Sequence, residues 1–241
     1  MRPFARRRRL RALQRAYYAG PERSEQAIAD YLRVLAEARE DELRRTQRGA
    51  KRPVALHIGS GGHYIRRWIN VDFLSAPPVD ISADASAALP FRSESVDYIH
   101  SEDFIEHDDL AVGKRFVAEA YRVLRAGGIM RLLTPDLRAL IRRVYDDRET
   151  KHLAWCKSYF GTDDACESLN MHLRMNGEHR FVYDEECLRR VLHNAGFAVR
   201  LVRWNASRDP WLRYLDLRDF GLNLFVECTK EPVHILPNGR R

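Results

Sequence analysis

The stretch Val54-Ala-Leu-His-Ile-Gly-Ser-Gly-Gly62 places a short apolar run directly before a glycine-rich turn. The apolar run predicts a buried β-strand over residues 54–58. A strand that leads straight into glycines can bring its backbone close to a ligand, because glycine has no Cβ and tolerates a positive φ. In doubly wound α/β sheets such a turn lies at the carboxyl edge, where ligands bind. The stretch therefore predicts a ligand-binding turn after the first strand of an α/β sheet.

The chain from Pro53 onward alternates short apolar runs with amphipathic helices, as α/β proteins do. Further strands are expected at 69–73, 79–81, 96–100, 129–133, 199–204 and 222–228. Helices are expected at 110–125, from 137 to about 145, and from an Asp184 cap to Asn194, whereas residues 155–180 carry little pattern. The predicted fold is a doubly wound, mostly parallel, seven-stranded sheet with helices on both faces and an antiparallel strand pair near its end.

Residues 1–50 are polar and helical in pattern, and we expect them to form a basic extension before a domain at 51–231. Within the extension, a helix from Ser24 to about Arg48 carries an apolar stripe at helical spacing: Ile28, Tyr31, Leu32, Leu35 and Leu43. Residues 232–241 are expected to be a loose tail.

The net charge of +7 comes from the start of the chain. Seven of the 41 Lys and Arg residues lie within residues 1–15, and the others balance the 34 Asp and Glu residues. A neutral body argues against a large nucleic-acid groove across the folded domain. The arginine-rich arm leaves three interpretations open. It is a solvated, partly disordered extension, it contacts an anionic membrane or a lipid-linked substrate, or it binds nucleic-acid phosphates.

The four cysteines are widely spaced and form no CxxC pair, which favours free thiols in a reducing compartment, the cytoplasm. No apolar run approaches the ~18–20 residues that span a bilayer, and no secretory signal is recognisable. We also predict no metal site. His152, Cys156, Cys166 and His172 lack a paired-ligand spacing, and Asp108-Asp109 and Asp163-Asp164 are interpreted as helix-start or solvated acids.

Asp72 ends the second predicted strand, where a carboxylate is suited to accept hydrogen bonds from two ribose hydroxyls. The turn reads Gly-Ser-Gly-Gly-His-Tyr rather than G-x-G-x-x-G, and Asp72 follows sooner than the ~20 residues expected for NAD. These two departures disfavour a dinucleotide cofactor.

Six segments in order carry a family resemblance. They are Leu56-His-Ile-Gly-Ser-Gly61, Trp68-Ile-Asn-Val-Asp72, Asp84 through Leu89-Pro-Phe91, Ser95-Val-Asp-Tyr-Ile-His-Ser-Glu102, Glu106-His107 and Tyr121-Arg-Val-Leu-Arg-Ala-Gly-Gly128. The chain resembles class I S-adenosylmethionine (SAM)-dependent methyltransferases, especially a compact bacterial branch associated with saccharide and surface-polysaccharide modification. The resemblance covers about residues 54–136, and extends more loosely through 177–184 and the last two strands.

The resemblance implies a cofactor site around the glycine turn. Gly59 and Gly61, with Ser60 between them, would pass beneath the methionine part of SAM, and Asp72 would hold the ribose. Asp84 and the backbone of Ala85 would meet the adenine edge, and Ser101 would lie beside the methionine and the sulfonium. Many class I enzymes carry an acid two residues before the first glycine, and this chain has His57 there.

The expected reaction is methyl transfer to a hydroxyl on a saccharide or glycosylated small molecule. His107 is the first candidate for the proton acceptor and His179 the second, because histidine titrates near working pH. Either histidine could instead orient its loop. The tryptophans could include a sugar-stacking platform or pack in the core. Two other functions stay open: a non-catalytic SAM-fold scaffold, and an RNA methyltransferase that uses the arm.

Overall fold

The computed structural model describes residues 12, 25–46, 52–73 and 79–232. The predictions for the arginine-rich arm and the loose tail concern residues that lie almost wholly outside these ranges. Among the described helices, none combines the length and the apolar character needed to cross a bilayer.

The sheet has seven strands, in the order β3-β2-β1-β4-β5-β7-β6. Their bounds are β1 Ala55–Ile58, β2 Ile69–Asp72, β3 Ile81–Ser82, β4 Val96–Glu102, β5 Leu124–Pro135, β6 Phe197–Leu201 and β7 Asn223–Lys230. The first five strands pair in parallel, and β7 runs antiparallel to both β5 and β6. The predicted mostly parallel sheet with a late antiparallel pair is confirmed, and the carboxyl ends of β1, β4 and β5 meet at one edge.

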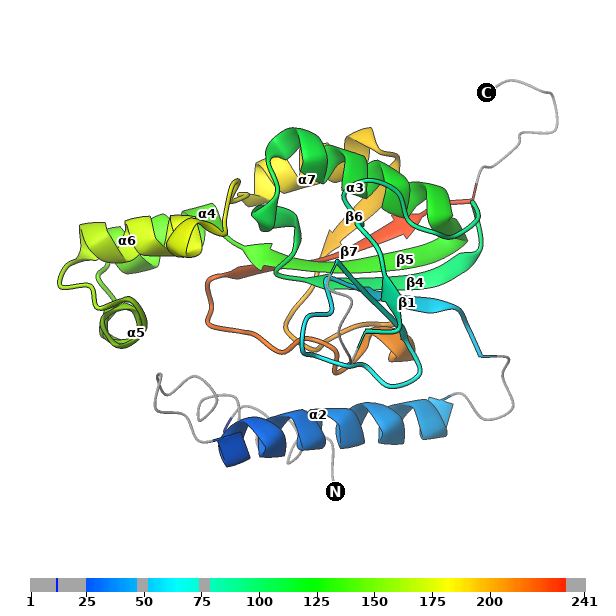
Figure 1. Ribbon diagram of the computed structural model, residues 1–241, viewed down its shortest axis with the longest axis horizontal. Helices are drawn as coiled ribbons and strands as arrows, with labels where there is room; N and C mark the ends of the chain where they lie inside the picture. The colour runs from blue at the N-terminus through cyan, green and yellow to red at the C-terminus, as the bar shows by residue number, and fades with distance from the viewer. Residues whose placement is uncertain (1–11, 13–24, 47–51, 74–78, 233–241) are drawn as a thin grey trace.

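Two helices cover one face of the sheet, α3 (Leu110–Val123) and α7 (Glu185–Asn194) (Figure 1). Asp109 caps α3 by accepting hydrogen bonds from the N–H groups of Ala111 and Val112, as an N-cap acid does. The apolar stripe of α3 is buried in the main core against β1, β4 and β5. The stripe at three- and four-residue spacing thus decides which side of α3 faces the sheet.

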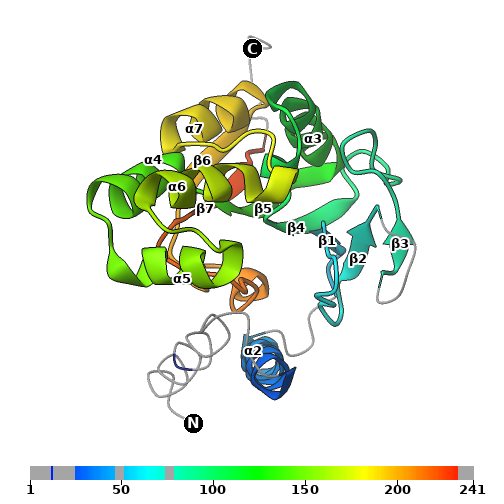
Figure 2. The same ribbon diagram turned by 60° about the vertical axis from the view of Figure 1, so that its left-hand side comes forward.

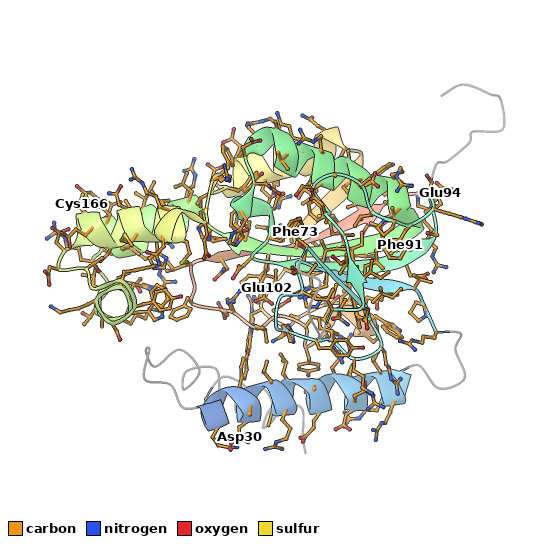
Figure 3. All side chains as sticks on the ribbon, in the orientation of Figure 1. Asp30, Phe73, Phe91, Glu94, Glu102 and Cys166 are labelled. Atoms are coloured by element: carbon orange, nitrogen blue, oxygen red, sulfur yellow. The ribbon has the colours of Figure 1, made fainter. Side chains whose placement is uncertain are left out.

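The long helix α2 (Glu25–Thr46) covers the opposite face, so the helical N-terminal extension is confirmed for these residues (Figures 1 and 3). Tyr31 is buried, and its hydroxyl donates a hydrogen bond to the carbonyl oxygen of Leu217 (2.6 Å). Leu35 and Leu43 from the predicted stripe are also buried, whereas the side chain of Ile28 lies outside the description. Asp30 lies on the side of α2 that faces away from the sheet (Figure 3). A short 3-10 turn, η4 (Pro210–Leu212), completes this layer with buried Trp211.

The region after β5 differs most from the prediction. The expected helix from 137 is the short α4 (Leu137–Leu140) followed by a π-helical turn, η2 (Ile141–Asp146), in which the N–H of Asp147 bonds to the carbonyl of Arg142. The weakly patterned residues form α5 (Thr150–Phe160), α6 (Ala165–Arg174) and the turn η3 (Met175–Gly177). In α5 only His152 and Cys156 are buried. A helix that buries so few side chains does not need an apolar stripe, which explains why the sequence of this region shows little pattern. Figure 2 shows α4, α5 and α6 as a group beside the end of the sheet.

Candidate functional site

A pocket of about 560 Å³ lies at the carboxyl ends of β1, β4 and β5. Its walls come from the glycine turn, the end of β4, the α5–α6 region and the segment 217–223. Of the residues predicted for the site, five line the pocket: Gly59, Ser60, Gly61, His107 and His179. Fold and pocket together place the site at the edge where ligands bind in doubly wound sheets.

Gly59 is held in the turn by its neighbours. Its N–H donates to the carbonyl of Val71 (3.0 Å), and its φ of +68° favours glycine. A Cβ there would lie 2.8 Å from the ring of Phe104. Gly61, with a φ of +47°, and Gly62 have open space where a Cβ would point. The turn therefore packs closely at its first glycine and leaves its tip open to the pocket.

Asp72 lies at the end of β2 next to the glycine turn. Its Oδ2 accepts a hydrogen bond from the N–H of Gly61 (2.8 Å), and its carbonyl accepts one from Ala83 (2.9 Å). Asp84 is exposed and accepts from the N–H of Ser86 (2.9 Å), and Ala85 is buried. These contacts bring the predicted ribose and adenine segments to the same edge, beside the turn.

The two predicted serines lie in different surroundings. Ser60 is buried at the pocket wall, and its hydroxyl has no hydrogen-bond partner among the described residues. Ser101 is buried in β4, its hydroxyl likewise lacks a partner within the described chain, and it is not one of the residues that line the pocket. Glu102 and Asp103, which follow it directly, line the pocket instead. Ser101 therefore lies directly before the two residues of this strand end that reach the pocket.

His57 lies two residues before the first glycine of the turn, where the sequence resemblance led us to expect an acid. Its Nδ1 lies 3.1 Å from Oδ1 of Asn70, and the same oxygen accepts from the N–H of Ile65 (2.8 Å). Because that amide atom is an acceptor, Nδ1 of His57 carries the proton. Burial lowers the pKa of His57 to about 3, so the imidazole is neutral. The imidazole of His57 is therefore a neutral ring with one hydrogen-bond donor and one acceptor, and it lines the same pocket as the glycine turn.

Glu102, at the end of β4, is hydrogen-bonded to the segment 217–223, which lines the pocket. Its two carboxylate oxygens accept hydrogen bonds from the N–H groups of Leu217 (2.9 Å) and Arg218 (2.8 Å). The guanidinium of Arg218 pairs with Asp103. Burial raises the pKa of Glu102 to about 8. Nothing in the sequence signalled that residues 217 and 218 would meet the end of β4.

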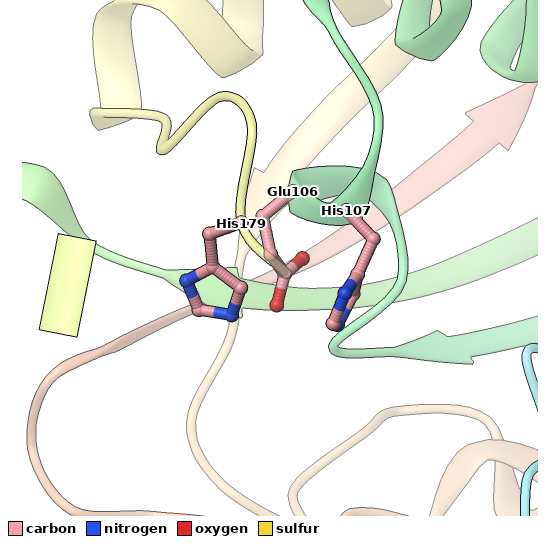
Figure 4. A group of neighbouring side chains, drawn as sticks. All are labelled: Glu106, His107 and His179. Atoms are coloured by element: carbon pink, nitrogen blue, oxygen red, sulfur yellow. The ribbon is translucent and has the colours of Figure 1, made fainter. Parts of the chain in front are cut away.

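His107 and His179 lie side by side, although they are far apart in the sequence (Figure 4). Their ring centroids are 5.1 Å apart and nearly perpendicular. The carbonyl of Glu106 accepts hydrogen bonds from the N–H groups of Arg180 (2.8 Å) and Phe181 (3.2 Å), which ties the two segments together. Burial lowers the pKa of His179 to about 4. The structure thus brings both predicted catalytic histidines to one wall of the pocket.

Aromatic side chains form another wall. Trp155 stacks on Tyr159 at a centroid distance of 4.8 Å and on His172 at 4.9 Å, and Phe220 lies 5.4 Å from it. All four line the pocket, and Tyr159 is half exposed. Trp68 and Trp211 are buried in the layer below the sheet, so they are core residues.

The residues at the turn fit the SAM that the sequence resemblance implied. The open space beside the backbone of Gly61 and Gly62 leaves room for a ligand. The hydroxyl of Ser60 makes no hydrogen bond to any other described residue. Asp72 supplies a partly exposed carboxylate at the neighbouring strand end. These are the groups that would hold the methionine part and the ribose.

Part of the chain matches a known protein family. Residues 56–132 match the family model described as a methyltransferase domain. No curated protein sequence matches the chain. Among solved structures, a SAM-dependent methyltransferase of Thermotoga maritima is similar at 19% identity and a TM-score of 0.46, with 85% of this chain and 96% of that chain covered. A SAM-dependent methyltransferase of Mesorhizobium loti is similar at 14% identity and a TM-score of 0.47, with 81% and 99% covered.

The matched segment runs from β1 to β5 and therefore contains the glycine turn, Asp72 and the end of β4. The family match, the six ordered motifs and the open turn beside a carboxylate lead to one conclusion. Residues 56–132 form a methyltransferase domain, and the chain is a methyltransferase that uses S-adenosylmethionine as its cofactor.

Proposed function

We propose that the protein transfers the methyl group of SAM to a hydroxyl oxygen of a saccharide or glycosylated small molecule. The observation that carries the proposal is that a single pocket is lined by the cofactor turn, Gly59–Gly62, and by His107 and His179. Methyl donor, acceptor and proton acceptor must be aligned in one cavity, because the methyl is transferred in line between two atoms.

The acceptor hydroxyl has to lose its proton during the transfer. When bound, SAM supplies a methyl group on a positively charged sulfur, so that an O–C bond forms while the C–S bond breaks and its electron pair stays on sulfur. His107 is our first candidate to accept the proton, and His179 is the second. His179 is neutral, but its pKa of about 4 makes it a weak base, which favours His107 for the direct role.

The walls of the pocket support a sugar as the acceptor. Trp155, Tyr159 and Phe220 offer aromatic surface, and Glu178 and Asn223 offer polar groups in the same cavity. A saccharide presents C–H groups that pack on aromatic rings and hydroxyls that bond to carboxylates and amides. A flat hydrophobic acceptor would leave these polar groups without a partner.

A labelling experiment tests this proposal. The purified chain is incubated with methyl-tritiated SAM and with separate pools of saccharides, glycolipids and nucleic acids. We expect the label in saccharide material, and we expect hydrolysis to release an O-methyl sugar. Label that appears only in nucleic acid, or in no pool although SAM binds, would contradict the proposal and favour the RNA-modifying or scaffold function.

A lipid-linked saccharide is the variant of this proposal that involves the arginine-rich arm. The seven arginines of residues 1–15 would attract an anionic bilayer by about 1 kcal/mol each near the surface. Cosedimentation with vesicles tests it. Binding of the full chain to anionic but not zwitterionic vesicles, and its loss at high salt, is expected. Equal recovery with both kinds of vesicle would refute the contact.

A further inference from the structure

Three potential metal ligands lie together beside the pocket. Glu106, His107 and His179 each offer a ligand atom, and these three atoms lie within 4.8 Å of one another. Figure 4 shows the carboxylate of Glu106 between the two imidazole rings. The cluster therefore contains one carboxylate and two imidazoles.

Glu106 and the nearby Asp103 each have one carboxylate oxygen held in place and the other without a partner among the described residues. Oε2 of Glu106 accepts a hydrogen bond from the hydroxyl of Thr134 (2.9 Å), and its Oε1 has no partner in the described part of the chain. One oxygen of Asp103 pairs with Arg218, and its buried Oδ1 has none among the described residues. Groups that orient one oxygen and leave the other open are typical of carboxylates that bind a metal ion.

Glu106 is fully buried, which makes its unpartnered oxygen costly. A second carboxylate nearby adds repulsion whenever both are ionised. A cation held between Glu106, His107 and His179 would satisfy the unpartnered oxygen of Glu106 and offset this repulsion.

We propose that Glu106, His107 and His179 bind a divalent transition-metal ion such as Mn²⁺, Fe²⁺, Co²⁺ or Zn²⁺. Two imidazoles with one carboxylate suit these ions, because Mg²⁺ and Ca²⁺ prefer oxygen ligands alone. Ligand atoms lie about 2.0–2.2 Å from such an ion, so opposite ligands are about 4.2 Å apart. The observed separations of up to 4.8 Å require only small side-chain rotations to close around it.

The role of the ion rests on the proposed function, whereas its binding does not. His107 and His179 of the cluster line the same pocket as the glycine turn, so the ion would contact an acceptor hydroxyl beside the cofactor. A hydroxyl bound to a divalent cation loses its proton more easily, because the cation stabilises the alkoxide. With the ion bound, His107 acts as a ligand, and its role as direct proton acceptor belongs to the metal-free protein.

Metal titration in the absence of SAM and acceptor tests the site. The full chain is treated with EDTA, freed of the chelator, and titrated with Co²⁺ by calorimetry and visible absorption. We expect one saturable site per chain with visible bands from a nitrogen-containing ligand set, and much weaker binding of Mg²⁺ and Ca²⁺. No saturable Co²⁺ binding, or equal affinity for Mg²⁺, would overturn the proposal.

Three variants locate the ion. Glu106→Gln keeps the shape of the side chain, and His107→Ala and His179→Ala remove ligands that are only partly buried. Each should weaken Co²⁺ binding by about 100-fold or more, since even changes behind the ligands cost 10–100-fold. Glu178→Gln is the matched control, because Glu178 precedes His179 and lines the pocket outside the cluster. Circular dichroism checks that each variant folds.

The pattern of affinities decides between the alternatives. Weaker Co²⁺ binding in the three ligand variants, together with unchanged Co²⁺ binding in Glu178→Gln, supports the site. Equal Co²⁺ affinity in all four variants refutes it. SAM binding and methyl transfer are measured separately on the EDTA-treated and the metal-loaded chain. Metal binding without methyl transfer to any saccharide would refute the proposed function alone, and full transfer without metal binding would refute the metal site alone.

Discussion

The carboxylate of Asp72 accepts a hydrogen bond from the N–H of Gly61 at 2.8 Å, which fastens the end of β2 to the turn after β1. The two strands are neighbours in the parallel sheet, with Ile58 opposite Val71. A residue expected to bind the ribose therefore also shapes the turn that is expected to receive the methionine part. The acidic side chain links the two halves of the expected cofactor site.

Replacement of Asp72 should weaken cofactor binding, because it removes both the expected contact with the ribose and the hydrogen bond that holds the turn. We expect Asp72→Ala to lower SAM affinity by roughly 10–100-fold, the effect of losing hydrogen bonds to a charged group. Asp72→Asn, which keeps an oxygen for Gly61, should lose less. Calorimetry measures both, with Asp163→Asn as the control, because Asp163 is exposed in the segment before α6. Affinity unchanged in Asp72→Ala would disprove the ribose role.

The glycines of the turn should respond differently to substitution. Gly59→Ala combines a φ of +68° with a Cβ 2.8 Å from Phe104, so the folded protein should lose about 1–3 kcal/mol of stability. A Cβ added at Gly61 meets no heavy atom within 4 Å, and asparagine tolerates a φ of +47°, so we test Gly61→Asn. Its melting temperature should stay close to that of the wild type, while its SAM affinity falls because the side chain enters the open space. A Gly61→Asn protein that binds SAM normally would contradict this account of the turn.

Removal of His107 should affect the chemical step more than cofactor binding. We expect His107→Ala to lower kcat by about 10²- to 10⁴-fold, because the hydroxyl loses the group that activates it. The Kd for SAM should change little, since we propose that the imidazole contacts the acceptor rather than the cofactor. Single-turnover assays with the saccharide acceptor and calorimetry with SAM separate the two effects. An unchanged kcat would assign the activation of the hydroxyl to another group.

Stability should be greatest near pH 6.5. The pKa is lowered by burial to about 3 for His57 and about 4 for His100, so these rings stay neutral in the folded chain. Unfolded histidine takes up a proton below about pH 6.5, and stability therefore falls as the pH drops from there. Burial raises the pKa of Glu102 from 4.5 to about 8. Between these two pH values Glu102 loses its proton in the unfolded chain but keeps it in the folded chain, so the free energy of unfolding falls as the pH rises toward 8.

Below pH 6.5 the histidines dominate, because the pKa is lowered for six of them and raised for the two glutamates Glu102 and Glu106. Urea unfolding at a series of pH values measures the free energy directly. A free energy of unfolding that keeps rising from pH 6.5 to 8 would contradict the assignment of a neutral, buried Glu102.

The sheet and the cofactor turn could be predicted because their signals are local. An apolar run followed by Gly59, and a strand that ends at Asp72, mark two parallel strand ends, which must meet at one edge. Asp109 and Asp184 cap helices as expected from their positions. His107 and His179 were also identified from the sequence, although only the structure brings their rings together.

The rest of the site depends on contacts that a sequence pattern does not record. Arg218 meets Asp103 because an irregular segment folds back to the end of β4, with no periodic signal to predict it. The aromatic wall comes from short helices in which few side chains are buried. Because these helices have no apolar stripe, the sequence did not indicate that Trp155 faces the pocket. Ser101 was the residue predicted at this strand end, whereas the side chains that reach the pocket are Glu102 and Asp103, because the register of the strand end decides which side chains point there.

The most direct test of the cofactor assignment is calorimetric titration of the full chain with SAM. We expect one molecule of SAM per chain, a saturable heat signal, and loss of that signal in the Asp72→Ala protein at the same concentrations. No heat from the wild-type chain at millimolar SAM, or the same binding curve for the wild type and Asp72→Ala, would contradict the account.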